Sequence, residues 1–127
     1  MANILLAEDD AAVREFVQRA LTHSGHRVTA VADGYGAAKA LAKAEYDLLL
    51  TDIVMPGMDG IDLAAAAAEA RPGMAVLLMT GYAAERQRAH TMDDLPFRVI
   101  AKPFSLREIC AAVNETLALR HAQKSVA

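Results

Sequence analysis

Residues 4–10 read Ile4-Leu5-Leu6-Ala7-Glu8-Asp9-Asp10, an apolar run that passes directly into three acidic residues. A short, continuous apolar run is typical of a β-strand that is buried on both faces. The next apolar residues are spaced i, i+3, i+4, i+7 and i+8, and they form one stripe on a helix over about residues 10–24: Val13, Phe16, Val17, Ala20 and Leu21. Gly25 ends this helix. The segment therefore predicts a buried strand, an acidic turn and an amphipathic helix.

Apolar runs and helical patterns alternate along the rest of the chain. The runs that predict strands cover residues 4–7, 27–32, 46–51, 74–79 and 97–101. Helical patterns cover residues 10–24, 36–44 and 61–70, one short helix is expected within residues 83–95, and a last helix begins after Ser105. Ser105 and Glu108 have the spacing of a capping box at the start of that helix. Five strands that alternate with five helices predict an α/β fold with an open, parallel, doubly wound sheet.

The composition predicts one folded domain over residues 1–120, followed by a flexible C-terminal tail over residues 121–127. The 127 residues are 54% hydrophobic, which excludes intrinsic disorder as the main state. No apolar run approaches the ~20 residues needed to cross a bilayer, and the N-terminus lacks the basic region of a signal peptide. The single cysteine, Cys110, excludes an intrachain disulfide and fits a cytoplasmic protein. With 13 basic and 16 acidic residues, the net charge of −3 predicts no nucleic-acid and no membrane partner.

Polar side chains follow four of the predicted strands. They are Glu8, Asp9 and Asp10 after the first strand, Asp52 after the third, Thr80 after the fourth and Lys102 after the fifth. Ligands of open α/β sheets bind beyond the carboxyl ends of the strands, so we expect these groups to converge. Crowded carboxylates repel one another, and a hard divalent cation such as Mg²⁺ relieves this repulsion through oxygen ligands. The pattern predicts a Mg²⁺ site with a hydroxyl and a lysine that faces an anion.

Each of these residues also has a simpler structural interpretation when it is considered alone. Asp10 has the position of a helix N-cap, and Glu8 and Asp9 would fit a solvated loop. Asp52 would fit a turn, and Thr80 and Lys102 would fit a strand exit and a surface position. The joint placement at one edge of the sheet favours the functional interpretation.

The order of these motifs resembles the receiver domain of two-component response regulators over about residues 3–118. The resemblance is carried by the segments Ile4-Leu5-Leu6-Ala7-Glu8-Asp9-Asp10, Thr51-Asp52-Ile53-Val54-Met55-Pro56-Gly57-Met58-Asp59-Gly60, Met79-Thr80-Gly81 and Ala101-Lys102-Pro103-Phe104. It implies a flavodoxin-like, CheY-like sheet with strand order 2-1-3-4-5. It also implies a cytoplasmic switch that catalyses its own phosphotransfer and is not a turnover enzyme.

The resemblance assigns roles to individual residues. Asp52 would be the phosphoacceptor, which takes a phosphoryl group from a phosphohistidine on a histidine kinase or a histidine phosphotransfer protein. Glu8, Asp9, Asp52 and the backbone carbonyl of Val54 would hold Mg²⁺. The Thr80 hydroxyl would bond a phosphoryl oxygen, and Lys102 would pair with the phosphate.

Two departures from the family pattern concern the switch and the lifetime of the phosphoryl group. Val99 occupies the position, three before the lysine, at which receivers usually carry an aromatic switch residue. Val54 and Tyr82 occupy positions, two after Asp52 and two after Thr80, that are often polar in the family. The usual coupling through a rotating ring is therefore not expected here.

Within the family, the chain most resembles the CpdR group of stand-alone regulators from alphaproteobacteria. The shared segments are Leu50-Thr51-Asp52-Ile53-Val54-Met55-Pro56, Thr80-Gly81-Tyr82-Ala83-Ala84 and Lys102-Pro103-Phe104-Ser105-Leu106-Arg107-Glu108, together with the valine at position 99. In that group the unphosphorylated form primes the ClpXP protease for its substrates and localises to the cell pole. A CheY-like or phosphorelay shuttle receiver, or a receiver cut from a hybrid histidine kinase, remains the alternative.

Other functional classes lack a required residue. Aspartate-nucleophile phosphatases need a second carboxylate two residues after the nucleophile, and that position is Val54. A nucleotide or flavin site needs a glycine-rich loop after the first strand, where Glu8-Asp9-Asp10 stands instead. We therefore expect output through protein contacts. The resemblance implies that these contacts lie on the face of the fourth helix, the fifth strand and the fifth helix, which should carry Arg86, Arg88, Arg98 and Arg107.

Overall fold

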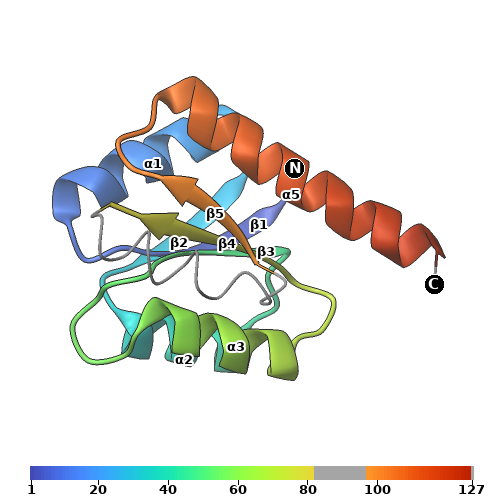
Figure 1. Ribbon diagram of the computed structural model, residues 1–127, viewed down its shortest axis with the longest axis horizontal. Helices are drawn as coiled ribbons and strands as arrows, with labels where there is room; N and C mark the ends of the chain where they lie inside the picture. The colour runs from blue at the N-terminus through green and yellow to red at the C-terminus, as the bar shows by residue number, and fades with distance from the viewer. Residues whose placement is uncertain (82–96, 127) are drawn as a thin grey trace.

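The computed structural model describes the backbone of residues 1–81 and 97–126, and the side chains of residues 1–81 and 97–120. Its centre is a parallel five-stranded sheet in the order β2-β1-β3-β4-β5 (Figure 1). The strands are β1 (Asn3–Ala7), β2 (Arg27–Val31), β3 (Leu48–Asp52), β4 (Ala75–Thr80) and β5 (Arg98–Ala101). The predicted α/β class, the parallel sheet and the strand order 2-1-3-4-5 are confirmed.

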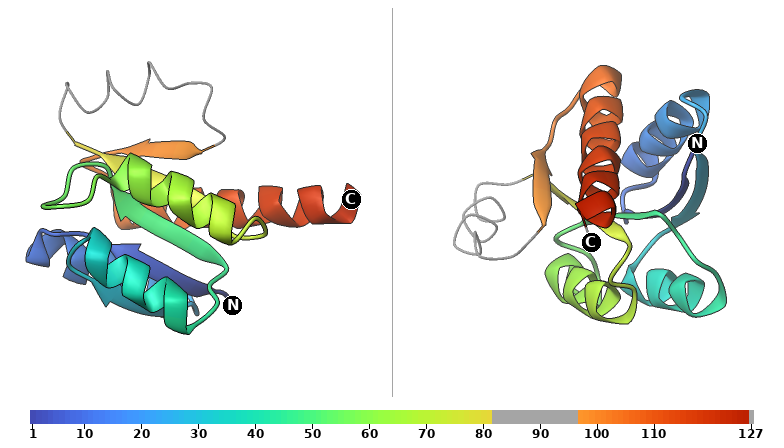
Figure 2. Two further views of the ribbon diagram at one scale, coloured as in Figure 1. Left: turned by 90° about the horizontal axis from the view of Figure 1, so that it is seen from below. Right: turned by 90° about the vertical axis from the view of Figure 1, so that its right-hand side faces the viewer.

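Helices cover both faces of the sheet in the part of the chain that the structure describes. They are α1 (Ala11–His23), α2 (Gly34–Lys43), α3 (Gly60–Ala70) and α5 (Leu106–Val126). Helices α1 and α5 lie on one face, and α2 and α3 lie on the other (Figures 1 and 2). The helix predicted within residues 83–95 lies outside the described residues. No helix within the described ranges is apolar over a length that would cross a bilayer.

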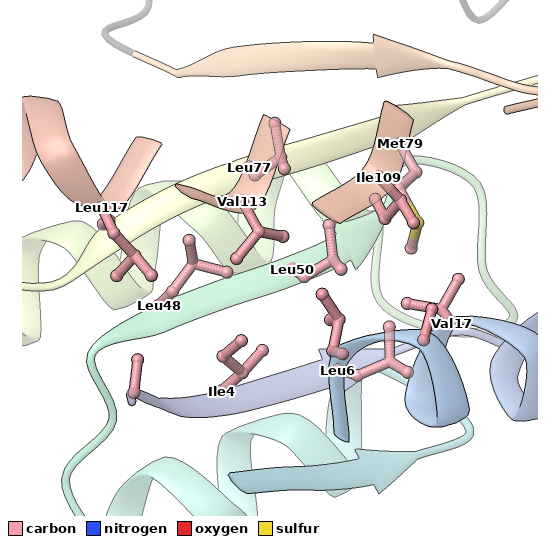
Figure 3. Packing of buried hydrophobic residues seen from close by; sticks show 14 residues of the cluster. Ile4, Leu6, Val17, Leu48, Leu50, Leu77, Met79, Ile109, Val113 and Leu117 are labelled. Atoms are coloured by element: carbon pink, nitrogen blue, oxygen red, sulfur yellow. The ribbon is translucent and has the colours of Figure 1, made fainter. Parts of the chain in front are cut away.

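Two apolar layers hold the helices against the sheet. Because side chains alternate between the faces of a strand, Leu48 and Leu50 of β3 face α1 and α5, whereas Leu49 faces α2 and α3. Figure 3 shows the first layer, in which Leu50 lies among side chains of β1, β4, α1 and α5. Strands β1, β3 and β4 are buried almost throughout, whereas the edge strands β2 and β5 are partly exposed. The polar residues at the ends of the central strands are therefore set on a rigid support.

Capping side chains fix where the four described helices begin, and in α3 the Asp59 carboxylate accepts from the N–H of Ile61 at 2.7 Å. The Asp10 carboxylate accepts hydrogen bonds from the N–H groups of Ala12 and Val13, so its predicted N-cap position is confirmed. The predicted capping box is also confirmed, because Ser105 and Glu108 bond each other's backbone N–H at 3.0 Å. Helix α2 begins at Gly34 and not at residue 36 as predicted, because Asp33 caps it through the N–H of Gly36 at 2.7 Å.

The last helix is longer than the sequence pattern predicts. Helix α5 continues to Val126, so the backbone of residues 121–126 is helical where a flexible tail was expected. In Figure 1 this end of α5 extends beyond the sheet. Arg120 anchors the helix before this end, through bonds from Nη1 to the backbone oxygen and Oδ1 of Asp47. The predicted division of the chain at residue 120 stays a prediction.

Candidate functional site

The ends of four strands carry the polar groups that the sequence singled out. Glu8 directly follows β1, Asp52 ends β3, Thr80 ends β4 and Lys102 directly follows β5. The strand register places Ala7 beside Thr51, and Thr80 beside Ala101. These groups therefore lie at the carboxyl edge of neighbouring strands, where ligands of doubly wound sheets bind.

Lys102 joins two acidic residues from strands that are distant in sequence. Its Nζ lies 3.0 Å from Oε1 of Glu8 and 3.1 Å from Oδ2 of Asp52. Glu8 is completely buried and Asp52 is 5% exposed, whereas 21% of the Lys102 side chain is exposed. The backbone also fixes Lys102, because its N–H donates to the carbonyl oxygen of Thr80 at 2.6 Å. The peptide bond from Lys102 to Pro103 is cis. The ammonium group thus sits as a fixed cation at the rim of the acidic centre.

Three carboxylates form this acidic centre. One oxygen each of Glu8, Asp9 and Asp52 lies within 4.8 Å of the other two. Burial, together with the hydrogen bond and negative charge of Asp52, raises the pKa of Glu8 from 4.5 to about 8, although Lys102 opposes this shift. Burial would lower the pKa of Lys102, but its contacts with Glu8 and Asp52 outweigh that effect and raise the pKa above 10.5. Among the described residues, the crowding of three acidic groups around one lysine therefore favours a proton on Glu8 when no cation is bound.

The donor set fits a hard divalent cation. The ligand atoms on offer are carboxylate oxygens, which Mg²⁺ prefers, and Asp9 is exposed enough to leave room for bound water. When Glu8 is ionised, its Oε2 is buried and has no hydrogen-bond donor in the described part of the chain. A buried oxygen without a partner is costly, and a cation would satisfy it.

A cleft of about 630 Å³ opens over this centre. Its floor is lined by Glu8, Asp9, Asp52 and Lys102, and its walls include Phe16, Val54, Gly81 and Phe104. Val54 is 51% exposed and Phe16 is 41% exposed, so apolar side chains surround the acidic floor. The cleft thus has room for an anion at the floor and an apolar rim for a partner.

The structure brings together most of the predicted site residues. Glu8, Asp9, Asp52 and Lys102 meet directly, and Val54 lines the same cleft. Thr80 is buried at the last position of β4, next to Gly81 in the wall. Asp10, the remaining acidic residue of this turn, lines the cleft and caps α1.

The predicted cationic output face is described only in part. Arg98 pairs with Glu115 at 3.1 Å, and Arg107 is exposed. Val99 is 43% exposed on β5. Arg86, Arg88 and Tyr82 lie outside the described residues.

Sequence reasoning missed two residues that shape the backbone of the site. Arg14 donates from Nη1 to the carbonyl oxygen of Glu8 at 2.9 Å and so closes the turn after β1. Thr51 donates from its hydroxyl to the carbonyl oxygen of Asp52 at 3.0 Å. The sequence offers one signal for Thr51, a hydroxyl residue directly after Leu48-Leu49-Leu50 in a run that otherwise predicts an apolar strand.

Both the sequence and the fold of the chain match known proteins. Residues 4–114 match the model of the response regulator receiver domain. The chain is 40% identical to the response regulator receiver protein CpdR of Brucella abortus, over 92% of this chain and 98% of that protein. It is 34% identical to the sensor kinase CckA of Brucella abortus, over 91% of this chain but 12% of the kinase. The crystal structure of a response regulator receiver protein from Sinorhizobium medicae WSM419 has a TM-score of 0.83 at 32% identity, and covers 93% of this chain and 95% of that one.

Proposed function

Because the chain belongs to the response regulator receiver family of two-component systems, we propose that it accepts a phosphoryl group on Asp52 from a phosphohistidine of a partner protein. The partner would be a histidine kinase or a histidine phosphotransfer protein. The observation that carries the proposal is the contact of Lys102 with both Asp52 and Glu8, at the floor of an open cleft. This arrangement gives an anionic nucleophile next to a fixed cation.

The proposed transfer exchanges one bond to phosphorus for another. An oxygen of the Asp52 carboxylate forms the new bond, while the bond between phosphorus and the partner's imidazole nitrogen breaks. The electron pair of the broken bond stays on that nitrogen, and the product is an acyl phosphate on Asp52. Such transfer needs positioning and neutralisation of charge more than covalent help from the protein.

Glu8, Asp9, Asp52 and the backbone carbonyl of Val54 would hold Mg²⁺ in this proposal. When bound, the ion would offset the negative charge of the phosphoryl oxygens and of the three carboxylates. Lys102 stays charged and would pair with a phosphoryl oxygen, and the Thr80 hydroxyl would donate a hydrogen bond to another. The protein would act as a switch and not as a turnover enzyme.

The output we propose is that of a CpdR-like regulator. The unphosphorylated form would prime the ClpXP protease for selected substrates, and phosphorylation of Asp52 would end this activity. The similarity to CpdR over nearly the whole length of that protein supports this part of the proposal. We further propose a cytoplasmic location and recruitment to the cell pole.

A receiver cut from a hybrid histidine kinase, or a CheY-like or phosphorelay shuttle, is the second candidate, and the similarity to CckA favours it. A degradation assay separates the candidates. Purified ClpXP with a reporter substrate should degrade it faster with the unphosphorylated protein than with the phosphorylated protein. Faster degradation with the phosphorylated form, or no effect of either form, would contradict the CpdR-like output.

Labelling by a small phosphodonor with Mg²⁺ tests the phosphoacceptor. The wild-type protein should be labelled, and chelation of Mg²⁺ should abolish the label. The variant Asp52→Asn should lose it, whereas Asp62→Asn, an exposed aspartate in the first turn of α3, should keep it. Undiminished labelling of Asp52→Asn would exclude Asp52 as the acceptor.

A further inference from the structure

Thr51 is a buried hydroxyl residue at the end of an apolar strand. It has no exposed surface, and it stands between Leu50 and Asp52 in β3. Its Oγ1 donates to the carbonyl oxygen of Asp52 at 3.0 Å and also contacts Sδ of Met55 at 3.8 Å. One hydroxyl therefore contacts the chain at two points, three residues apart.

The same stretch of backbone is held from outside by Gly60. A Cβ atom on Gly60 would lie 1.8 Å from the carbonyl oxygen of Asp52, so only a residue without a side chain fits there. The N–H of Gly60 donates to the carbonyl oxygen of Ile53 at 2.8 Å, and the N–H of Ile53 donates to Met79 at 3.0 Å. The chain that leaves β3 is thus fixed at Asp52 and at Ile53.

Val54 lies between the two points that Thr51 contacts. Its side chain is half exposed, whereas its neighbours Ile53 and Met55 are buried. With little packing of its own, Val54 takes its backbone orientation from the residues on either side. Thr51 contacts the chain on both sides of Val54, at the Asp52 carbonyl two residues before it and at the Met55 sulfur directly after it.

We propose that Thr51 is a positioning residue, whose hydroxyl sets the course of residues 52–55 and so orients the Val54 carbonyl toward the acidic centre of Glu8, Asp9 and Asp52. This inference rests on the proposed function, because it concerns the Mg²⁺ site of that function. Thr51 would contact neither the metal nor the phosphoryl group. Its effect would resemble that of residues that orient metal ligands without binding the metal themselves. Mutation of such residues lowers metal affinity by roughly 10–100-fold.

The simpler interpretation is that Thr51 only satisfies a buried hydroxyl, and the chain contains a matched control for it. Thr116 is also buried, at 6% exposure, and its hydroxyl donates to a backbone carbonyl, that of Ala112, at 2.7 Å. That bond lies within one turn of α5. The same substitution at the two positions removes a buried hydroxyl that bonds a backbone carbonyl in each case.

The experiment compares the variants Thr51→Val, Thr51→Ser and Thr116→Val with the wild type. Thermal unfolding without metal measures stability, and titration calorimetry with MgCl₂ measures Mg²⁺ affinity directly. Both valine variants should lose stability, but Thr51→Val alone should bind Mg²⁺ about tenfold more weakly. Thr51→Ser keeps the donor and should restore the affinity of the wild type. Labelling of Asp52 by a phosphodonor at low Mg²⁺ concentration should follow the same order.

Equal Mg²⁺ affinity of Thr51→Val and Thr116→Val would overturn the inference and leave the proposed function intact. Failure of the wild type to bind Mg²⁺ would overturn both. Met55→Leu gives a second test if Thr51→Val does not fold, because it removes the sulfur contact and keeps a side chain of similar volume. Met55→Leu should weaken Mg²⁺ binding in the same direction, and unchanged binding in that variant would also overturn the inference.

Discussion

Replacement of Glu8 by glutamine should change how the stability of the protein depends on pH. Glu8 is fully buried, and its pKa is raised to about 8 from its usual value of 4.5. Between pH 4.5 and about pH 8, the folded protein therefore holds a proton on Glu8 that the unfolded chain has released. The free energy of unfolding therefore falls as the pH rises through this interval, by up to about 1.4 kcal/mol per pH unit. The total is on the order of a few kcal/mol at pH 8 and above.

The assay is thermal or urea unfolding at pH values from about 5 to 9, in buffer with a metal chelator. The wild type should lose stability as the pH rises, whereas the neutral side chain of Glu8→Gln removes this contribution. At high pH the variant should be more stable than the wild type, with a Tm difference of roughly 4 °C for each kcal/mol. Lys102 adds no slope in this range, because its raised pKa makes its stabilising effect complete below pH 10.5.

Asp9→Asn is the matched control. It removes one negative charge from the same acidic centre, but at an exposed position. Its pH profile should keep the slope of the wild type, and the difference between the two variants isolates the burial of Glu8. Addition of Mg²⁺ at pH 8 should stabilise the wild type, because the ion binds the folded state. A stability difference between wild type and Glu8→Gln that does not vary with pH would refute this reasoning.

Three further predictions concern the same site. The double variant Glu8→Gln/Asp9→Asn should keep the fold but lose the Mg²⁺-induced rise in Tm, and a remaining rise would contradict the assignment of these residues as ligands. Lys102→Met should lower the free energy of unfolding at pH 8 by about 3–5 kcal/mol, because it leaves the buried carboxylates of Glu8 and Asp52 without the cation between them; a loss below about 1 kcal/mol in urea unfolding would count against this. Gly60→Ala should destabilise the protein strongly, since its Cβ would collide with the Asp52 carbonyl, whereas Ala66→Gly on the exposed side of α3 should cost only about 1 kcal/mol; equal effects in unfolding experiments would show that the chain relaxes freely at Gly60.

The positions of Glu8, Asp52 and Lys102 in the fold could be predicted from the sequence, because strand ends are easy to locate. The run 4–7 stops where Glu8 begins, and Leu48-Leu49-Leu50 stops just before Asp52, so the positions of both carboxylates follow from the apolar runs. Parallel pairing then brings Glu8, Asp52 and Lys102 to one edge without further information. The helix caps could also be predicted from the sequence, because the side chains of Asp10, Ser105 and Glu108 bond backbone groups only a few residues away.

The features that the sequence did not predict depend on contacts between distant segments. The apolar run predicts that residues 46 and 47 belong to the third strand. In the structure β3 begins at Leu48, and Asp47 accepts hydrogen bonds from the N–H of Asn3 and from Arg120. The bond from Thr51 to the Asp52 carbonyl requires the chain to turn directly after β3, which an alternating pattern does not reveal. Secondary-structure propensity reflects the local preference of each residue, whereas the bounds of β3 are decided by contacts between distant segments.

The exposed Val99 limits how a phosphoryl group on Asp52 could act on the rest of the protein. A β-branched side chain is restricted at its first dihedral, so Val99 lacks the reach of a ring that swings between buried and exposed positions. Lys102 offers another connection, because its side chain contacts Asp52 and its backbone bonds Thr80. Phosphorylation would give the ammonium group a new anion to pair with and would weaken its bond to Glu8. The next residues along the chain reach Phe104, which lines the cleft and packs against the core under α5. We therefore expect the segment from Lys102 to the start of α5 to respond first.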